Sequence, residues 1–162
     1  PALMTGFISP LAGSDAWKTF DGKIGGAMNS IFELGSAIGS PKVPKSMEFY
    51  NKYKQNYGKA LQAGHGPAPA YESVYILAEA IERAGSLDPD AIVAELEKTD
   101  RTGVMGRVKY DEGHQAIFGS NPQETAVGTV FQWTEDGKRK IVFPESIAEA
   151  KIQLPPGLKS LK

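Results

Sequence analysis

PAPAYESVYILAEAIERAG, residues 67–85, carries the clearest structural signal in this chain. Its apolar residues recur at steps of three and four, the period of an amphipathic helix. The predicted apolar face comprises Tyr71, Val74, Tyr75, Leu77, Ala78, Ile81 and Ala84, and the polar face Glu72, Glu79, Glu82 and Arg83. Gly85 stands where a left-handed C-terminal cap belongs. We therefore expect a buried helix with Tyr75, Leu77, Ala78 and Ile81 turned inward and Glu79 and Glu82 in solvent.

The segment before this helix is a candidate binding region. Pro67 and Pro69 each push the preceding residue toward extended geometry, which predicts a rigid, extended approach to the helix. His65, Pro69 and Tyr71 lie along this approach, where the backbone is held firmly. We take all three as candidate ligand-binding residues. For His65 a structural role and for Tyr71 packing of the helix start remain alternatives.

A second candidate region follows the first predicted strand, within residues 1–8. A loop of small residues comes next, and open α/β sheets bind ligands beyond the carboxyl ends of their strands. Ser9 and Pro10 lie in this loop, and Trp17 follows on a short predicted helix. These three are also candidate ligand-binding residues, with a core or outer-surface role as the alternative for Trp17.

Further elements alternate along the chain. We expect a strand in 25–34, a helix capped by Ser46 and ended by Gly58, a helix from Asp88 to Lys98, strands at 107–110, 126–134 and 139–143, an Asp136-Gly137 hairpin turn, and a short helix from Ile147. Alternating strands and helices indicate an α/β fold.

Composition and motifs exclude several classes of function. The 162 residues have a net charge of −1 and contain no cysteine, which argues against a nucleic-acid partner and excludes thiolate metal sites. No phosphate loop, His-Glu-x-x-His or Gly-x-Ser-x-Gly motif is present. Asp111 and Glu112 are adjacent, and neighbours in an extended chain point to opposite faces, so a turn is expected there and not an acid–base pair. We expect no enzymatic activity, no cofactor and no metal.

Four segments resemble one family in the same order. AYESVYILAEAIERAGS at 70–86, TGVMGRVKYDEGH at 102–114, GTVFQWTEDGK at 128–138 and IVFP at 141–144 are similar to segments of the type I periplasmic solute-binding proteins. These include the branched-chain amino-acid (Leu/Ile/Val) receptors of ABC transporters. The resemblance covers most of the chain and matches the C-terminal half of such a receptor.

The resemblance implies a fold of two Rossmann-like lobes, of which only the C-terminal portion is present. Residues 1–65 would belong mainly to the second lobe, 66–128 would return to the first, and 129–162 would form a crossing hairpin and tail. It also implies a signal peptide in the precursor and a periplasmic or extracytoplasmic location, with or without a lipid anchor.

The function implied is small-molecule binding and delivery to the membrane permease of an ABC importer. The implied partners are the ligand, that permease and the missing N-terminal half of the receptor. A sensory or regulatory module of the same fold is the alternative. In the amino-acid receptors the loop matching Ser9–Ser14 carries an acidic residue for the ligand ammonium, whereas this loop has none before Asp15. We therefore favour an uncharged, anionic or aromatic ligand over a zwitterionic amino acid, while amino acids, amides and aromatic acids all stay open.

Overall fold

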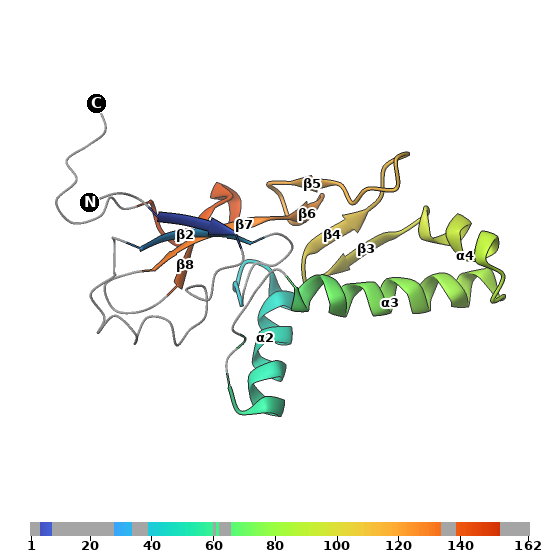
Figure 1. Cartoon of the computed structure of the whole chain (residues 1–162), viewed down its shortest axis with the longest axis horizontal. Helices are drawn as coiled ribbons and strands as arrows, with labels where there is room; N and C mark the ends of the chain where they lie inside the picture. Colours follow the sequence, from blue (N-terminus) through green and yellow to red (C-terminus); the bar gives the residue numbers. More distant parts are fainter. Residues whose placement is uncertain are drawn as a thin grey trace.

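A computed structural model describes residues 4–7, 28–33, 39–59, 61, 66–133 and 139–152. Its elements are β1 (Met4–Phe7), β2 (Met28–Glu33), α2 (Pro44–Tyr57), α3 (Pro67–Ala84), α4 (Pro89–Leu96), β3 (Asp100–Gly103), β4 (Gly106–Lys109), β5 (Phe118–Gly119), β6 (Ala126–Val127), β7 (Thr129–Trp133), β8 (Arg139–Phe143) and the 3-10 turn η3 (Glu145–Ile147). Most of the expected helices and strands are present over similar ranges (Figure 1), but in the described residues they occur in blocks, two strands, three helices and then six strands, and do not alternate one by one.

The first sheet joins strands from both ends of the chain. Its order is β1-β2-β7-β8, with β1 parallel to β2 and the other neighbours antiparallel. β7 and β8 form the predicted antiparallel pair, while the Asp136-Gly137 turn lies outside the described residues. Residues 31–33 of β2 therefore pair with residues 129–131 of β7, about a hundred positions later in the chain.

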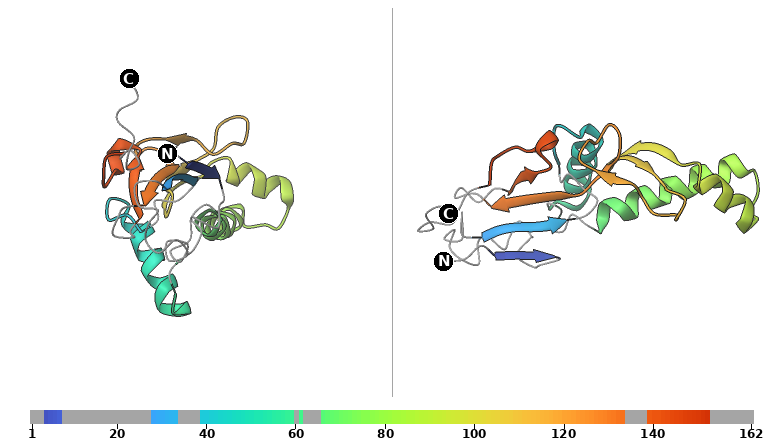
Figure 2. Two further views of the ribbon diagram at one scale, coloured as in Figure 1. Left: turned by 60° about the vertical axis from the view of Figure 1, so that its left-hand side comes forward. Right: turned by 90° about the horizontal axis from the view of Figure 1, so that it is seen from above.

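The second sheet is built from residues 100–127 alone. Its order is β3-β4-β6-β5, and β3 and β4 form a hairpin in which Gly103 pairs with Gly106. Gly106 has φ 94°, and a Cβ there would lie 2.6 Å from the carbonyl oxygen of Thr125. Figures 1 and 2 show the two sheets side by side, with α3 running along the second sheet. The chain passes from β6 in one sheet to β7 in the other at Gly128.

The helix α3 buries a different face from the one we predicted. Its buried residues are Ala68, Glu72, Ile76 and Ala80, which recur every four positions. Val74, Tyr75, Leu77 and Ala78 are exposed, and Ile81 is half-buried, so the inward assignment of Tyr75, Leu77 and Ala78 is wrong. The face in contact with the second sheet is narrow, and small residues on it permit close packing. Glu82 is exposed as expected, Glu79 is half-buried, and Glu72 lies in the core.

The start of α3 also differs from the expectation. The helix begins at Pro67, so both prolines lie in its first turn instead of in an extended approach. The first turn tolerates proline because its N–H groups have no partner inside the helix. Gly85 closes the helix at φ 58°, which confirms the predicted cap.

Of the other predicted helix ends, some are confirmed and some are wrong. Asp88 caps α4 by accepting the Ala91 N–H at 3.0 Å, as predicted. Gly58 ends α2 at φ 67°, also as predicted. Ser46 is not the cap of α2: the helix begins two residues earlier, and the buried Ser46 hydroxyl accepts the Gly39 N–H at 3.2 Å. The short helix expected from Ile147 is instead η3, which ends at that residue.

Two groups of buried apolar side chains form the core of the described residues. One lies between α3 and the second sheet and contains Ala68, Ile76, Val104, Met105, Val108 and Ala126. The other joins Val43, Val127, Ile141 and Ile147. Phe49 of α2 and Tyr71 of α3 pack against the first group, which places both rings at the junction of two helices and a sheet.

Candidate functional site

A buried carboxylate joins α3 to the β3–β4 hairpin. The Glu72 side chain is 2% exposed. Its Oε1 accepts the Val104 N–H at 2.8 Å, and its Oε2 accepts Arg101 Nε at 3.1 Å. A buried carboxylate needs such partners because leaving water costs several kcal/mol for an unpaired charge. A Cβ on Gly103 would lie 1.9 Å from Glu72 Oε2, so only glycine leaves room for this arrangement.

Arg101 extends the network across one face of α3. Besides Glu72 it pairs with Glu79, and its guanidinium carbon lies 5.0 Å from the centre of the Tyr75 ring. These contacts combine ion pairs with a cation–π interaction. Burial lowers the pKa of Arg101, but the carboxylates of Glu79 and Glu72 more than offset this effect, so the pKa is raised overall. The Arg101 side chain therefore stays charged. The network therefore holds Tyr75 beside the start of β3.

A pocket of about 180 Å³ opens beside this network, between α2, α3 and β3. Its lining comprises Lys45, Glu48, Phe49, Lys52, Tyr71, Glu72, Tyr75, Arg101 and Val104. We call it the Tyr71 pocket. The rings of Phe49, Tyr71 and Tyr75 follow one another, with centres 4.8 and 4.9 Å apart, close enough for favourable tilted packing. The pocket thus combines an aromatic wall with charged groups of both signs.

The Tyr71 hydroxyl is held in its protonated form. It donates to the Tyr75 oxygen at 3.4 Å. This hydrogen bond is the largest cause that raises the Tyr71 pKa from 10.0 to about 12, followed by burial and by the negative charges of Tyr75, Glu72 and Glu48. At neutral pH Tyr71 therefore offers a neutral hydroxyl, able to donate or accept a hydrogen bond, and no charge.

Of the six predicted ligand-binding residues, the structure describes Pro69 and Tyr71. Tyr71 lines the pocket, and Pro69 lies half-buried in the first turn of α3, where its carbonyl accepts the Ser73 hydroxyl at 2.8 Å. Ser9, Pro10, Trp17 and His65 lie outside the described residues. The assignment of these six residues to a ligand site stays a prediction.

Sequence reasoning missed the charged part of this site. Helical spacing puts Glu72 on the polar face of the predicted helix, and Arg101 belongs to no recognisable motif. Their only local signal is the Gly103 and Gly106 pair, which indicates a tight turn near a close packing contact. The contacts themselves join residues 29 and 32 positions apart, so no short motif records them.

Among the residues that the structure describes, no three His, Asp or Glu side chains gather as a metal site. Nor does any helix in those ranges have the length and apolar character needed to cross a membrane.

Comparison with known proteins now identifies the family. A family model described as "Periplasmic binding protein" matches residues 6–138, most of the chain. The chain belongs to this family. Since its members are solute-binding proteins and not enzymes, the expectation of a non-enzymatic protein is confirmed.

Curated relatives of this periplasmic binding protein come from Brucella. "Leu/Ile/Val-binding protein homolog 8" of Brucella abortus (strain 2308) is 30% identical over 118 residues, covering 72% of this chain and 28% of the relative. "Leu/Ile/Val-binding protein homolog 7" of Brucella suis biovar 1 (strain 1330) is 28% identical over 123 residues, covering 74% and 29%. The chain thus spans less than a third of the length of these relatives.

Solved structures agree on the fold. The leucine-binding protein LivK of Thermotoga maritima matches with a TM-score of 0.51 and 27% identity, over 69% of this chain and 29% of LivK. A Silicibacter pomeroyi protein, provisionally assigned as a branched-chain amino acid ABC transporter, matches with a TM-score of 0.62 and 15% identity, over 80% and 34%; this likeness concerns the fold alone. The predicted type I fold is confirmed, as is the partial coverage expected of a C-terminal portion.

Proposed function

We propose that this periplasmic binding protein chain is part of an extracytoplasmic receptor that binds a small solute and delivers it to the permease of an ABC importer. The observation that carries the proposal is the family match over residues 6–138. The relatives are named as homologues of a Leu/Ile/Val-binding protein, which adds branched-chain amino acids to the candidate solutes. Family membership also supports a location outside the cytoplasm, in the periplasm or anchored to the outer surface of a membrane.

The ligand we propose is a small amphipathic molecule: an amino acid, an amide or an aromatic acid. The Tyr71 pocket supports this class because it combines ring surfaces with the charged ends of Lys45, Glu48 and Lys52. Apolar walls with a few polar groups are the usual composition of small-molecule sites. Tyr71 would contribute stacking and a hydroxyl, with Ser9, Pro10, Trp17, His65 and Pro69 completing the proposed site.

We further propose that residues 1–65 and 129–162 serve one lobe and residues 66–128 the other. The sheet topology supports this division, because β1 and β2 share a sheet with β7 and β8, whereas β3 to β6 form a separate sheet. The change of sheet occurs at Gly128, next to the proposed boundary. Hinge motion between such lobes would close the receptor on its ligand.

The remaining part of the receptor is the proposed partner of α3. Val74 is 67% exposed and Leu77 46% exposed, although both are large apolar residues of α3. Exposing large apolar side chains to water is unfavourable, and contiguous exposed apolar residues often mark an interaction surface. We propose that these residues pack against receptor segments outside this chain, as the length of the relatives allows.

Calorimetry on the full receptor tests the function. A panel of leucine, acetamide and benzoate would be titrated into the parent and into Trp17→Ala and Tyr71→Ala. We expect one ligand to bind the parent tightly and both variants to bind it at least tenfold more weakly. Tyr57→Phe is the matched control, because Tyr57 is 64% exposed and does not line the pocket. If a tight ligand is found and neither variant weakens it, the site assignment is wrong; if no solute of the panel binds, the proposed ligand class is wrong.

A further inference from the structure

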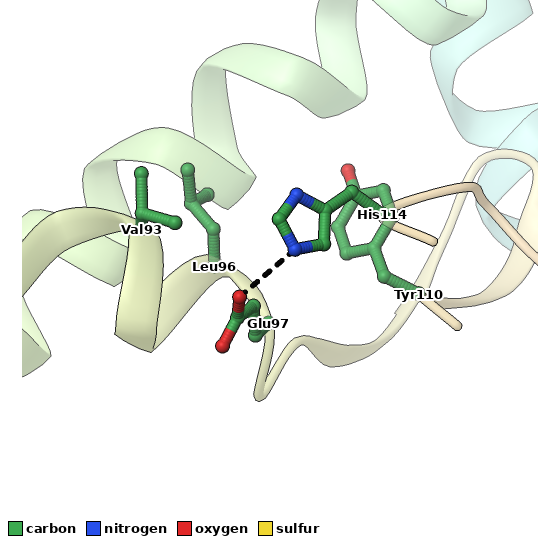
Figure 3. Close-up of a pocket in the computed structure, with 5 residues that line it drawn as sticks. All are labelled: Val93, Leu96, Glu97, Tyr110 and His114. Carbon is green, nitrogen blue, oxygen red and sulfur yellow. Dashed lines mark ion pairs between the residues drawn. The ribbon is translucent and has the colours of Figure 1, made fainter. Parts of the chain in front are cut away.

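A second cavity lies between α4 and the loop that follows β4. Its volume is about 180 Å³, and Val93, Leu96, Glu97, Tyr110 and His114 line it. Figure 3 draws Val93, Leu96 and Glu97 on the α4 side and Tyr110 and His114 on the loop side. None of these residues lines the Tyr71 pocket. The cavity is therefore a separate feature, which we call the α4 pocket.

The loop holds His114 in an unusual backbone conformation. His114 has φ 60°, and it is the one residue other than glycine with positive φ in the part of the chain that the structure describes. A turn anchored on Asp111 maintains this geometry, since Asp111 Oδ1 accepts the N–H groups of Gly113 and Gln115, each at 2.9 Å. Backbone strain of this kind recurs at binding sites, where the surrounding structure enforces it. Here its result is that the imidazole faces α4.

The imidazole and a carboxylate meet at the edge of the α4 pocket. His114 Nε2 lies 3.0 Å from Glu97 Oε1 (Figure 3). Both side chains are more than half exposed, so a solute can reach them from solvent. The walls next to them are apolar, formed by Val93 and Leu96 with the Tyr110 ring. The feature is an apolar hollow open to solvent, with a carboxylate at its rim that His114 contacts through one oxygen. A negatively charged group beside apolar walls has the chemistry of a site for a hydrophobic cation.

We propose that the α4 pocket binds a hydrophobic ammonium ion, a protonated alkylamine or arylalkylamine. The apolar body would lie among Val93, Leu96 and Tyr110, and the ammonium would donate hydrogen bonds to the Glu97 carboxylate. The hollow is large enough for a ring-sized body, since even an enclosed apolar cavity of roughly 150 Å³ holds benzene, and this one is open to solvent on one side. A carboxylate of the same shape would face the Glu97 charge and be repelled. This site is independent of the solute site proposed above and goes beyond it.

A matched pair of probes tests the charge preference. 2-Phenylethylammonium and 3-phenylpropionate would be titrated separately into protein with labelled valine and leucine methyl groups. We expect the ammonium to give saturable shifts at Val93 and Leu96, and the propionate to bind at least tenfold more weakly. Equal binding of the two probes, or shifts absent from these two residues, would overturn the proposal.

A pair of variants then tests the role of Glu97. Glu97→Gln keeps the side-chain shape and removes the charge, and we expect about tenfold weaker binding of the ammonium. Glu82→Gln removes another exposed carboxylate, on α3, and should leave the affinity unchanged. If Glu97→Gln binds the ammonium as well as the parent, or if both variants weaken it equally, the assignment of Glu97 is wrong.

Discussion

The close packing of α3 against the β3–β4 hairpin depends on the absence of a Cβ atom at Gly103. Glu72 occupies the space where a side chain at position 103 would begin. Neither residue is a core residue by type, since one is charged and the other has no side chain. Their pairing satisfies a buried carboxylate and lets the hairpin approach the helix.

The first prediction concerns this contact. Gly103→Ala should reduce the free energy of unfolding by about 1–3 kcal/mol, because the added methyl group must displace the Glu72 carboxylate from its partners. Urea unfolding would measure the change. Gly66→Ala is the control: no atom lies within 4 Å of a Cβ there, so its effect should stay within ~0.5 kcal/mol. Equal small effects of both changes would show that Glu72 relaxes without cost.

The second prediction concerns the ionisation of Tyr71. Its pKa of about 12, against 10.0 for an unperturbed tyrosine, means that the folded state keeps this proton after the unfolded state has lost it. The stabilisation is therefore complete below pH 10 and is lost as the pH rises from 10 to about 12. In an ultraviolet titration one of the six tyrosines should ionise near pH 12, and Tyr71→Phe should remove that phase.

The control for this titration is Tyr57→Phe, which removes an exposed tyrosine distant from Tyr75 in the sequence. It should leave the phase near pH 12 in place. A spectrum in which Tyr71→Phe loses only a phase near pH 10 would contradict the hydrogen bond between Tyr71 and Tyr75.

The stability of a helix depends on the capping of its ends as well as on the packing of its side chains. α4 has eight residues and no fully buried side chain, so its cap matters more than packing. Short helices are marginal without tertiary support, which makes each satisfied terminal N–H valuable.

The third prediction follows from this dependence. Asp88→Ala should cost about 1 kcal/mol, because the Ala91 N–H loses its acceptor. Asp88→Asn retains an oxygen at the same place and should cost much less. Hydrogen exchange of the Ala91 amide would report the local effect. Equally fast exchange in the alanine and asparagine variants would argue against a capping role.

In the larger receptor that we propose, other segments cover the exposed apolar residues of α3. The fourth prediction is that Leu77→Gln changes the unfolding free energy of this chain by less than about 0.5 kcal/mol, as expected for an exposed position. In the full receptor the same substitution should destabilise more strongly, by about 2–5 kcal/mol for a residue that becomes buried.

Unfolding of both proteins in urea would measure the difference, with Ile76→Gln as the reference. Ile76 is 5% exposed, so that substitution should be severely destabilising in both contexts. If Leu77→Gln has the same small effect in the full receptor, Leu77 is not covered there.

Local sequence patterns were sufficient to place most of the helices and strands and several of their ends. The Asp88 cap, the glycines at 58 and 85 and the strand 139–143 depend on local chemistry, because a cap or turn is satisfied by residues a few positions away. The four resembling segments were likewise sufficient for the family and the fold, which are properties of the pattern as a whole. The expectation for Tyr71 rested on an extended approach that is helical in the structure. Its side chain lines the Tyr71 pocket, and its role in a ligand site stays a prediction.

Contacts between distant segments of the chain set which face of α3 is buried and what the Tyr71 pocket contains. Helical periodicity shows that two faces differ, yet contact is decided by what packs nearby, and here the hairpin meets the face with Glu72 and small residues. The burial of Glu72 is possible because Arg101 and the Val104 N–H arrive from 29 and 32 positions further along the chain. The free energy of such a contact depends on chain segments meeting in space, and no local pattern in the sequence encodes it.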